Sequence, residues 1–564
     1  MTATAELIFA PPGPGVWMLE TSHFTRPATR FHAEIFPEQF VRGFGESLRR
    51  YGSLLDHLDW AFVNGFPYYC PRPVGAPPEA LGHPPRAVWD HLAEGHAGIR
   101  ERLQTSATVF ERRLWREDVE RWDREVKPAA VREHRALLSV EPAMLDTAAL
   151  LAYLDRCREN QKRGAYVHHL FNVPALLPVG DLLVHCQEWT GRPAAEILGL
   201  LQGYTPDPLG ADQELERLRL AIERDGAARA LLDSAPDPAE LLVSLRSLRG
   251  ETGAAAAAYV DTVGWRPVNG EDVGEPNAIE LPELVAGAIR MALERAGGTD
   301  QAELERRSVE LRDDVPAAHR RAFDELLGEA RLVYRLRDER GTFADLWAIG
   351  IMRRAILAAG ARLATSGRIA DAAHLVEADY GELRALVTSG DGPSAEELAQ
   401  RTRYRQEARY VDAPAVLGGE PGEPLPAEWL PPPAARLERA LAAAFGALFM
   451  APEPDTQGLR VRGLGVSAGV YEGPARVVQG THDFARIEQG DVLVTNSTTT
   501  AFNIVLPLLG AIVTDRGGLL SHAAIVSREY GIPAVVGTTD ATAVVPDGAL
   551  VRVDGGLGEA VVVR

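Results

Sequence analysis

Residues 514–537 read TDRGGLLSHAAIVSREYGIPAVVG, and this stretch decides what the rest of the chain is expected to be. It continues the apolar run GAIVT, which predicts a buried strand. Gly517 and Gly518 predict a tight turn that few side chains would permit. Ser521 is placed to cap a helix that begins at His522, and the letters GIP further along predict the end of that helix. His522 therefore lies in the first helical turn, at the positive end of the helix dipole.

This placement gives His522 a chemical role. An imidazole with an ordinary pKa of about 6.5 is largely neutral at cellular pH, so one ring nitrogen can attack a phosphorus atom. The phosphorylated ring carries negative oxygens, which backbone N–H groups at a helix start and in a glycine turn hold well. Arginines offer guanidinium groups to the same oxygens, although an arginine on a surface helix is equally often a solvated charge. We predict that His522 is phosphorylated and that its phosphoryl group is surrounded by Thr514, Arg516, Gly517, Gly518, Ser521 and Arg528.

The composition predicts a folded, acidic protein of several domains. With 564 residues the chain is too long for one ordinary core, so roughly two to four domains are expected. Hydrophobic residues make up 46% and charged residues 24%, which is typical of globular proteins. The formal net charge of −20 repels phosphate backbones and anionic lipid headgroups, so neither nucleic acid nor a membrane surface is the expected partner.

Cysteine usage and the first residues indicate a cytoplasmic protein. Cys70, Cys157 and Cys186 are widely spaced and form no CxxC pair, so neither a disulfide framework nor a metal site is predicted. The chain starts without a basic segment ahead of an apolar run, and nowhere do about 18 uncharged apolar residues follow one another. We therefore expect no export signal and no membrane span.

Changes in composition and in the spacing of apolar residues divide the sequence into four regions. Residues 1–90 are rich in proline and aromatic residues and are expected to form an irregular cap. Residues 91–410 show apolar residues at three- and four-residue steps, which is typical of a large α-helical domain. Residues 411–459 predict a Pro-rich linker with one short helix. Residues 460–564 alternate short β-rich runs with Gly and Asp turns, so the predicted fold is a mostly α-helical domain followed by a C-terminal α/β domain.

The C-terminal region resembles the phosphohistidine swivelling domain of the phosphoenolpyruvate-utilising enzymes, among them phosphoenolpyruvate synthase, pyruvate phosphate dikinase, rifampin phosphotransferase and phenylphosphate synthase. The family pattern reads T-x-x-G-G-x-x-S-H-x-A-I-x-x-R-x-x-G-x-P-A-V-V-G. The flanking stretches GLGVSAGVYEGPARV and PDGALVRVDGGLGEAVV extend the resemblance over the whole region. The matching positions are Thr514, Gly517, Gly518, Ser521, His522, Ala524, Ile525, Arg528, Gly531, Pro533 and Gly537.

The resemblance implies a relay. His522 would take a phosphoryl group at one site, and the domain, with the family's β/β/α fold, would swing on its linkers to deliver it at a second. The two Pro-rich joints VDAPAVLGGEPGEPLPAEWLPPP and APEPDTQG are where we expect that swing to hinge. One position departs from the family, because Leu520 stands where plant pyruvate phosphate dikinases carry a regulatory threonine. Control by phosphorylation at that position is therefore not expected.

The resemblance also implies what must come from elsewhere. Phosphoenolpyruvate synthase and the dikinase carry an ATP-grasp domain and a barrel that binds phosphoenolpyruvate, and we find the pattern of neither in these 564 residues. The order of a helical and then a swivelling domain is similar to rifampin phosphotransferase without its ATP-grasp domain. It also resembles the histidine-bearing subunit of phenylphosphate synthase. We therefore expect ATP and Mg²⁺ to be bound by a separate ATP-grasp partner, with none bound tightly by this chain.

The helical domain and its cap are expected to hold a small organic acceptor. The stretch GWRPVNGEDVGEPNAIELPELV is similar to part of the family's acceptor domain, with its spacing loosened. Packing is the alternative, since adjacent helical histidines point about 100° apart and buried aromatic residues usually belong to a core. The candidate acceptor-pocket residues are His168, His169 and His185 and an aromatic entrance of Trp60, Phe66 and Tyr68. His168 or His169 would deprotonate an acceptor hydroxyl.

The leading hypothesis is a phosphotransferase that relays a phosphoryl group from ATP, through phospho-His522, to a hydroxyl group of that acceptor. The product would be a stable phosphoester or an intermediate activated for a later elimination. The alternative is a phosphocarrier or regulatory phosphohistidine protein without a small-molecule acceptor. A degenerate scaffold is a third possibility, which the intact stretch GGLLSHAAIVSREYG disfavours.

Overall fold

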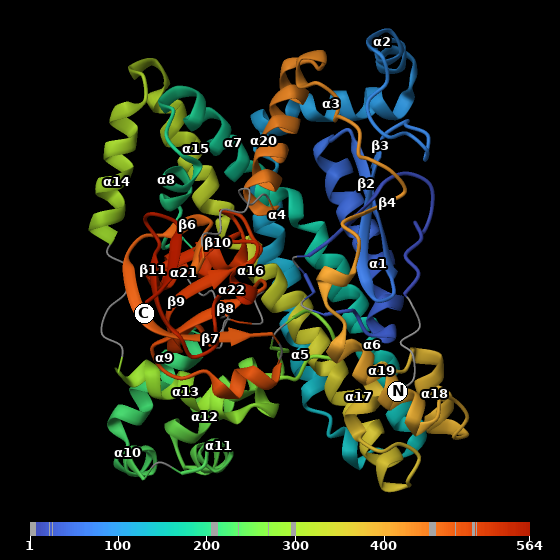
Figure 1. Ribbon diagram of the computed structural model, residues 1–564, viewed down its shortest axis with the longest axis vertical. Coiled ribbons are helices and arrows are strands. Elements are labelled where there is room, and N and C mark those ends of the chain that lie inside the picture. The colour runs from blue at the N-terminus through green and yellow to red at the C-terminus, as the bar shows by residue number, and fades with distance from the viewer. Residues whose placement is uncertain are drawn as a thin grey trace. The chain divides into compact units, whose positions relative to one another are not determined.

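A computed structural model describes most of the chain (Figure 1). The chain divides into two compact units, and each is described by itself. Unit 1 comprises Met1–Leu177, Asp272–Gly274 and Ile351–Leu441, and unit 2 comprises Pro178–Glu271, Glu275–Gly350 and Ala442–Arg564. The described residues are 7–21, 23–24, 26–204, 212–234, 236–268, 270–294, 301–449, 458–479, 481–498, 502 and 505–563.

Unit 1 is built around a long helix and an antiparallel sheet. Helix α1 (Arg30–Tyr51) buries one apolar face, because Phe36, Phe40 and Phe44 recur at four-residue steps. The sheet has the order β2-β3-β1-β4 and all its pairings are antiparallel. Its strands are β1 (Trp17–Leu19), β2 (Leu55–Val63), β3 (Phe66–Pro73) and β4 (Val416–Leu417).

Further helices complete unit 1. Those that lie wholly within it are α2 (Arg86–Gly95), α3 (Ala97–Arg112), α4 (Trp115–Arg121), α5 (Lys127–Leu138), α6 (Thr147–Leu170), α18 (Tyr380–Thr388) and α19 (Ala395–Glu407). The division between the units falls within α7 (Asn172–Thr190), α17 (Trp347–Thr365) and α20 (Pro432–Phe449). The stretch Thr147–Thr190 is long and apolar enough to cross a membrane, but 83% of its most apolar window is buried in the structure, as in a core helix.

Unit 2 combines helices with a mixed sheet. Its helices are α8 (Ala194–Gly199), α9 (Asp212–Arg224), α10 (Gly226–Asp233), α11 (Pro238–Ser247), α12 (Glu251–Val263), α13 (Pro282–Glu294), α14 (Gln301–Asp314), α15 (Arg320–Tyr334), α16 (Leu336–Arg340), the π-helical segment η5 (Gly341–Leu346), α21 (His522–Tyr530) and α22 (Ala541–Val544). Its strands are β5 (Arg460–Arg462), β6 (Leu464–Ser467), β7 (Val470–Val478), β8 (Asp491–Thr495), β9 (Leu509–Thr514), β10 (Ala534–Val536), β11 (Leu550–Asp554) and β12 (Glu559–Val562).

The sheet of unit 2 has eight strands in the order β5-β12-β11-β7-β8-β9-β10-β6. The four central strands β7, β8, β9 and β10 run parallel, and the outer pairings are antiparallel. Because β8 and β9 are parallel, their carboxyl ends meet at one edge, where Thr495 pairs with Thr514. The loops that follow these two strands are therefore neighbours.

Both faces of this sheet are buried. Alternate residues of β9 point to opposite faces, so Ile512 joins one hydrophobic core and Val513 the other. The larger core contains residues of α9, α11, α12 and α13 together with α21, and Figure 1 shows these four helices along one side of the sheet. The C-terminal sheet domain and the helices between residues 212 and 294 thus share one core.

The predicted fold class is confirmed, because a large helical region precedes a C-terminal mixed sheet. The irregular cap predicted for residues 1–90 is wrong, since this region contains α1 and the hairpin β2–β3. The prolines and aromatic residues of this region obscured the four-residue spacing of buried side chains that marks α1 as a helix. Residues 91–410 also do not form one unit, because the chain leaves and re-enters unit 1 between them.

The Pro-rich segment after residue 411 is partly anchored. Its strand β4 pairs with β1, and the carbonyl of Pro414 accepts a hydrogen bond from the Tyr68 hydroxyl at 2.8 Å. The short helix predicted within residues 411–459 is present as α20. Most of the second joint, residues 451–457, lies outside the described residues.

Truncation of Ile512 should test the shared core. Ile512→Ala removes a fully buried side chain and leaves a cavity, so we expect a loss of about 2–5 kcal/mol in the free energy of unfolding of unit 2. Leu550→Ala, at a position that is 43% exposed, is the control and should cost less than about 1 kcal/mol. Thermal unfolding followed by calorimetry checks the order, and equal shifts for the two variants would contradict it.

Candidate phosphohistidine site

The helix that carries His522 begins and ends as its sequence predicts. The Ser521 side chain accepts a hydrogen bond from the backbone N–H of Ala524 at 3.4 Å, and α21 starts at His522. Gly531 closes the helix in the left-handed conformation, with φ of 64°. The predicted cap, first helical residue and helix end are therefore confirmed.

The glycine turn before α21 is tightly constrained. Gly517 has φ of 113°, and a Cβ atom there would lie 2.8 Å from the Ser521 hydroxyl oxygen, so only glycine fits. The N–H groups of Gly518 and Leu520 donate hydrogen bonds to the carbonyls of Leu448 and Ala447 in the last turn of α20, at 3.0 and 2.8 Å. The Gly518 N–H, which we predicted to face a phosphoryl group, is thus already bonded in this structure.

The ring of His522 is buried and held by a second side chain. It is 3% exposed, and its Nδ1 lies 2.9 Å from the hydroxyl of Thr498, which follows β8. Burial lowers the pKa of His522 well below its ordinary value, and the nearby charge of Arg337 lowers it further. The imidazole is therefore neutral, the form that attacks phosphorus. If Nδ1 carries the proton and donates to Thr498, the lone pair lies on Nε2.

Arg528 takes a structural role. Its guanidinium donates to the carbonyls of Leu519 at 2.9 Å and Val466 at 3.3 Å, and to the hydroxyl of Tyr334 at 3.1 Å. Because the side chain is buried among these partners, the expectation of a solvated surface charge is wrong for Arg528. Arg528 thus joins the loop before α21, through Leu519, to β6 and α15. Its predicted contact with phosphate stays a prediction.

The other two predicted phosphate-binding residues lie at the start of the loop. Arg516 is exposed, as expected of a solvated charge. Thr514 is buried, and its hydroxyl donates to the carbonyl of Arg516 at 2.7 Å. Thr514 therefore shapes the turn between β9 and Gly517.

The helical part of unit 2 brings a charged segment to His522 that the sequence analysis missed. Arg337 on α16 is close enough to act on the ring, and its Nη1 donates to Asp338 at 3.1 Å. Burial, and then the repulsion of Arg337, lowers the pKa of Arg340 to about 9, against the attraction of Glu271, Asp338 and Asp345. Burial likewise raises the pKa of the Asp338 carboxyl.

The signal for this segment was present in the letters RLRDER, five charges within six residues of an otherwise apolar helical region. The π-helical segment η5 follows directly, and such segments are frequent at functional sites. Local periodicity could not show that this helix is buried or that it meets α21.

The predicted acceptor-pocket residues of unit 1 are part of a packed interior. His168 and His169 are both buried, with stacked rings 4.6 Å apart, and Nδ1 of His169 lies 2.7 Å from the carbonyl of Ala165. Trp60 packs on Phe40 at a ring distance of 4.5 Å. These positions agree with ordinary packing, and a catalytic role for either histidine stays a prediction.

The remaining pocket candidates are distributed over both units. Phe66 packs on Tyr410 at a ring distance of 5.4 Å, and burial raises the pKa of Tyr68 to about 12. His185 belongs to unit 2, where its Nδ1 lies 2.8 Å from the carbonyl of Asp181 and its ring contacts Trp189. His185 is therefore held by its own helix.

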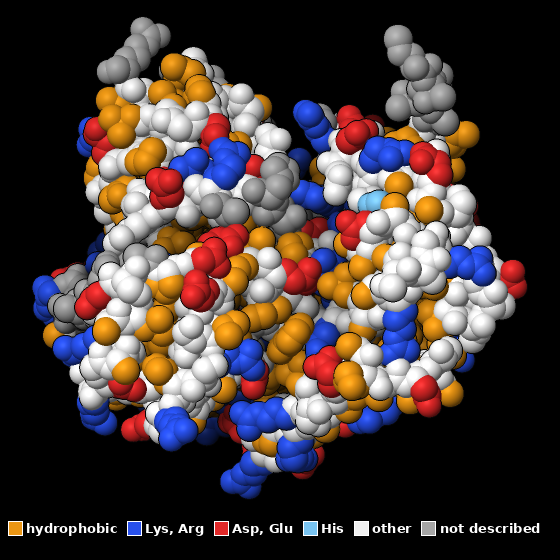
Figure 2. Space-filling model, turned by 90° about the horizontal axis from the view of Figure 1, so that it is seen from below, with side chains coloured by type: hydrophobic (Ala, Val, Ile, Leu, Met, Phe, Trp, Pro, Cys, Tyr) orange, Lys and Arg blue, Asp and Glu red, His pale blue; other side chains and the backbone are white. Residues whose placement is uncertain are grey.

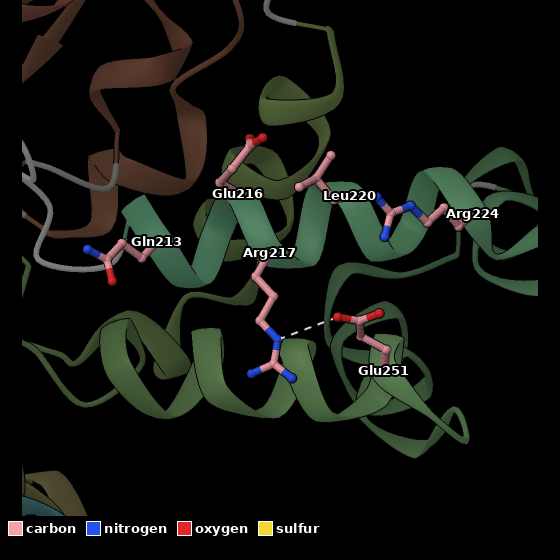
Figure 3. A pocket seen from close by; sticks show the side chains of 6 residues that line it. All are labelled: Gln213, Glu216, Arg217, Leu220, Arg224 and Glu251. Atoms are coloured by element: carbon pink, nitrogen blue, oxygen red, sulfur yellow. Dashed lines mark ion pairs between the residues drawn. The ribbon is translucent and has the colours of Figure 1, made fainter.

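A surface groove is a second candidate for a binding site, beside the charged segment around Arg337 and Arg340. A groove of about 470 Å³ between α9 and α12 contains an ion pair of 3.8 Å between Arg217 and Glu251 (Figure 3). Its other lining residues are Gln213, Glu216, Leu220 and Arg224, and it is open to solvent. On the face shown in Figure 2, charges of both signs alternate with hydrophobic side chains, and no field of one sign stands out.

His522 thus lies at a helix start, after a glycine turn and at the carboxyl edge of parallel strands, and the strand, turn and helix follow in the order that the sequence predicted. Residues 487–558 match the model of the PEP-utilising enzyme mobile domain, and residues 172–355 match that of the rifampicin phosphotransferase fourth domain. The chain is thus similar to the mobile domain of the phosphoenolpyruvate-utilising enzymes in its C-terminal region and to a domain of rifampicin phosphotransferase in its helical region. The predicted family resemblance is confirmed.

Individual relatives agree with this assignment. The chain is 28% identical over 435 residues to a rifampicin phosphotransferase of Streptomyces sp, covering 72% of this chain and 46% of that protein. An uncharacterised phosphotransferase of Bacillus subtilis is 29% identical over 313 residues, 54% of this chain and 36% of that one. A probable phosphoenolpyruvate synthase of Archaeoglobus fulgidus is 48% identical over 98 residues, 17% of this chain and 13% of that protein. The chain spans less than half the length of each.

Burial of His522 should make stability depend on pH. The folded chain holds the ring neutral, whereas the unfolded ring titrates near its ordinary pKa of about 6.5. As pH falls below about 6.5, the unfolded chain gains a proton that the folded chain does not, so the free energy of unfolding falls by up to ~1.4 kcal/mol per pH unit.

The variant His522→Asn removes this contribution and should flatten the pH dependence between about pH 6.5 and 5.5. Unfolding midpoints measured at several pH values check the slope. The matched control is His91→Asn, at an exposed position, which should keep the wild-type slope. Identical slopes for wild type and His522→Asn would contradict a buried, neutral ring.

Proposed function

We propose that the protein is a phosphotransferase that passes a phosphoryl group from ATP, through phospho-His522, to a hydroxyl group of a small organic acceptor. The observation that carries this proposal is the buried ring of His522 at the start of α21, held by Thr498 within the matched mobile domain and exposed to the charge of Arg337 from the matched fourth domain. A neutral imidazole supplies the nucleophile, and the half-buried guanidinium of Arg337 is suited to the charge of a phosphoryl group in transfer.

The relay has two half-reactions. In the first, a ring nitrogen of His522 forms a bond to a phosphorus atom of ATP. The bond from that phosphorus to its bridging oxygen breaks, and the rest of the nucleotide leaves with the electron pair. In the second, the acceptor oxygen attacks the same phosphorus, the N–P bond breaks, and the hydroxyl proton leaves to a base. Mg²⁺, bound with ATP on an ATP-grasp partner, would neutralise polyphosphate charge in the first step.

Burial of the ring supports a division of these steps between two conformations. A side chain that is 3% exposed has little access to a bulky nucleotide, so loading requires the mobile domain to expose His522. The arrangement with Arg337 beside the ring is then the one in which the phosphoryl group is discharged. The product is either a stable phosphoester or an intermediate for a later elimination, and the use of ATP fits a cytoplasmic protein.

Loading of His522 can be tested without the partner. Phosphoramidate is a small phosphoryl donor, and its P–N bond would break as the bond from phosphorus to the imidazole forms. We expect label that is labile in acid and stable in alkali, located at His522 by mass spectrometry and absent there from His522→Ala. The absence of label from wild-type His522 after long incubation would show that no conformation exposes the ring, and the proposal would fail.

Arg337 should act mainly on the second step. Arg337→Gln removes the positive charge that acts on the His522 ring but leaves the glycine turn intact. We therefore expect the rate of loading to change less than the rate of discharge. Loss of one donor to the transferred group should slow discharge by about 10²-fold. Release of label from the loaded protein measures this rate, and Arg321→Gln, at a side chain that is 92% exposed and outside the predicted site, is the control. Equal slowing by both variants would contradict a specific role for Arg337.

A further inference from the structure

A hollow of about 310 Å³ lies on unit 1, where the start of α6 meets the ends of α17 and α18. Every residue that lines it belongs to unit 1 and to the described part of the chain. Its volume is within the range of roughly 300–1,000 Å³ that is typical of small-molecule sites. None of the residues assigned to phosphoryl transfer lines this hollow, so it is a separate candidate for a binding site.

The lining of the hollow combines apolar, cationic and hydroxyl-bearing side chains. Leu150, Leu363 and Leu386 are buried, with no more than 7% of each exposed. Arg362 is half-buried and Arg368 is exposed. The hydroxyl-bearing lining residues are Thr147, Ser366, Thr388 and Ser389. No acidic residue lines the hollow, so a matching ligand has an apolar part and an anionic group.

Backbone carbonyls hold both guanidinium groups in place. Nη2 of Arg362 donates to the carbonyl of Pro142 at 3.1 Å and to that of Leu145, in the chain that leads into α6. Nη1 of Arg368 donates to the carbonyl of Gly390 at 3.0 Å. Only glycine fits at Gly390, because a Cβ atom there would overlap the guanidinium of Arg368. Carbonyl partners orient the two guanidinium groups but leave their full positive charges in place.

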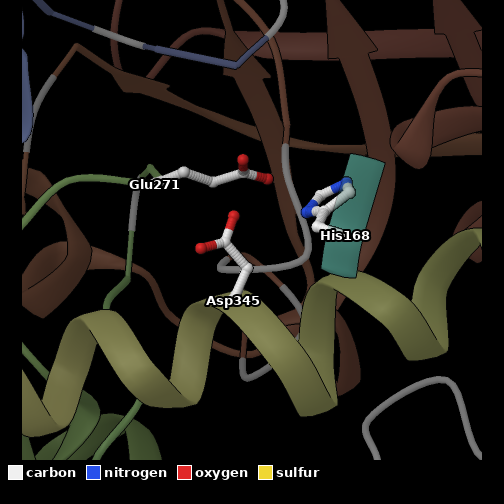
Figure 4. Close-up of side chains that lie close together, drawn as sticks. All are labelled: His168, Glu271 and Asp345. Atoms are coloured by element: carbon white, nitrogen blue, oxygen red, sulfur yellow. The ribbon is translucent and has the colours of Figure 1, made fainter. Parts of the chain in front are cut away.

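No carboxylate balances these two charges. Arg340 of unit 2 shows the contrast, because it is attracted by Glu271 and Asp345, two buried carboxyl groups of unit 2 that lie close together (Figure 4). Within the described residues, Arg362 and Arg368 form no ion pair, and their remaining nitrogens have no hydrogen-bond partner. In a chain with a net charge of −20, two such cations in one hollow favour an anionic ligand.

The acidic groups near the hollow are engaged elsewhere. The carboxylate of Asp146 caps α6 by accepting from the N–H of Ala149 at 2.8 Å. That of Asp391 accepts from the hydroxyl of Ser389 at 2.7 Å. Neither aspartate lines the hollow. A phosphate group suits the arginines well, because its several oxygens can accept from two guanidinium groups at once.

We propose that this hollow binds a small organic phosphate ester, whose phosphate group is shared by Arg362 and Arg368. The phosphate oxygens accept hydrogen bonds from the guanidinium nitrogens that the backbone carbonyls do not use. The organic part packs on the buried leucines, which removes apolar surface from water. This site goes beyond the proposed function, because binding there involves neither His522 nor a phosphoryl transfer.

The test uses the full-length protein with phenyl phosphate as the probe, titrated at low ionic strength and followed by ³¹P NMR. We expect wild type and His522→Ala to bind the probe equally. Arg362→Gln and Arg368→Gln should each weaken binding by about 10-fold or more, since each removes a hydrogen bond from a charged donor. Ser366→Phe, at an exposed lining position, should abolish binding because the larger side chain fills the hollow.

Two control variants separate the hollow from the net charge of the protein. Arg124→Gln removes the same charge from a side chain of unit 1 that is 77% exposed, so it should bind like wild type. Arg368→Lys keeps a positive charge and should recover part of the affinity lost in Arg368→Gln. Melting temperatures report whether Arg362→Gln, which also releases the chain ahead of α6, still folds. If it does not, Arg368→Gln and Ser366→Phe decide the test.

Several results would overturn the proposal. The site is absent if wild type does not bind phenyl phosphate, or if Arg368→Gln and Ser366→Phe both bind it with wild-type affinity. Loss of binding in His522→Ala would assign the probe to the phosphohistidine site instead. Inorganic phosphate or benzoate binding as tightly as phenyl phosphate would exclude an organic phosphate as the preferred ligand. None of these results bears on the proposed function, which the loading of His522 tests by itself.

Discussion

The structure around the candidate site depends on one constraint, the burial of a neutral imidazole beside a guanidinium group. Water no longer solvates a charge on the ring, and the cation of Arg337 disfavours protonation further. A protonated imidazole has no lone pair to offer to phosphorus. Burial therefore keeps His522 nucleophilic over the whole physiological range of pH.

The neighbouring features keep the ring in this position. The Thr498 hydroxyl fixes one ring nitrogen, the Ser521 cap fixes the start of α21, and Gly517 lets the chain turn sharply between β9 and the helix. Arg528 ties the loop carbonyl of Leu519 to the sheet and to α15. These contacts leave the His522 ring little conformational freedom, so the orientation of the imidazole is set before any phosphoryl group arrives.

Local signals allowed part of this to be predicted from the sequence. A capping serine, a glycine at the helix end and a glycine turn act within a few residues, so the boundaries of α21 could be read directly. Thr498 and Arg337 reach His522 only through the pairing of β8 with β9 and the packing of α16. Such contacts join distant parts of the chain, and one sequence carries no periodicity that reports them. Arg528 shows the same limit, since a buried and a solvated arginine share one letter.

The two hydrogen bonds from the histidine loop to α20 have a mechanical consequence. The N–H groups of Gly518 and Leu520 cap the final carbonyls of α20, so the end of that helix is fastened to the loop it precedes by some seventy residues. While these bonds hold, rotation about the chain just after Phe449 cannot turn the sheet independently of the helix end. A rotation that keeps both bonds would therefore have its pivot upstream of the last turn of α20, on the side of the earlier Pro-rich joint.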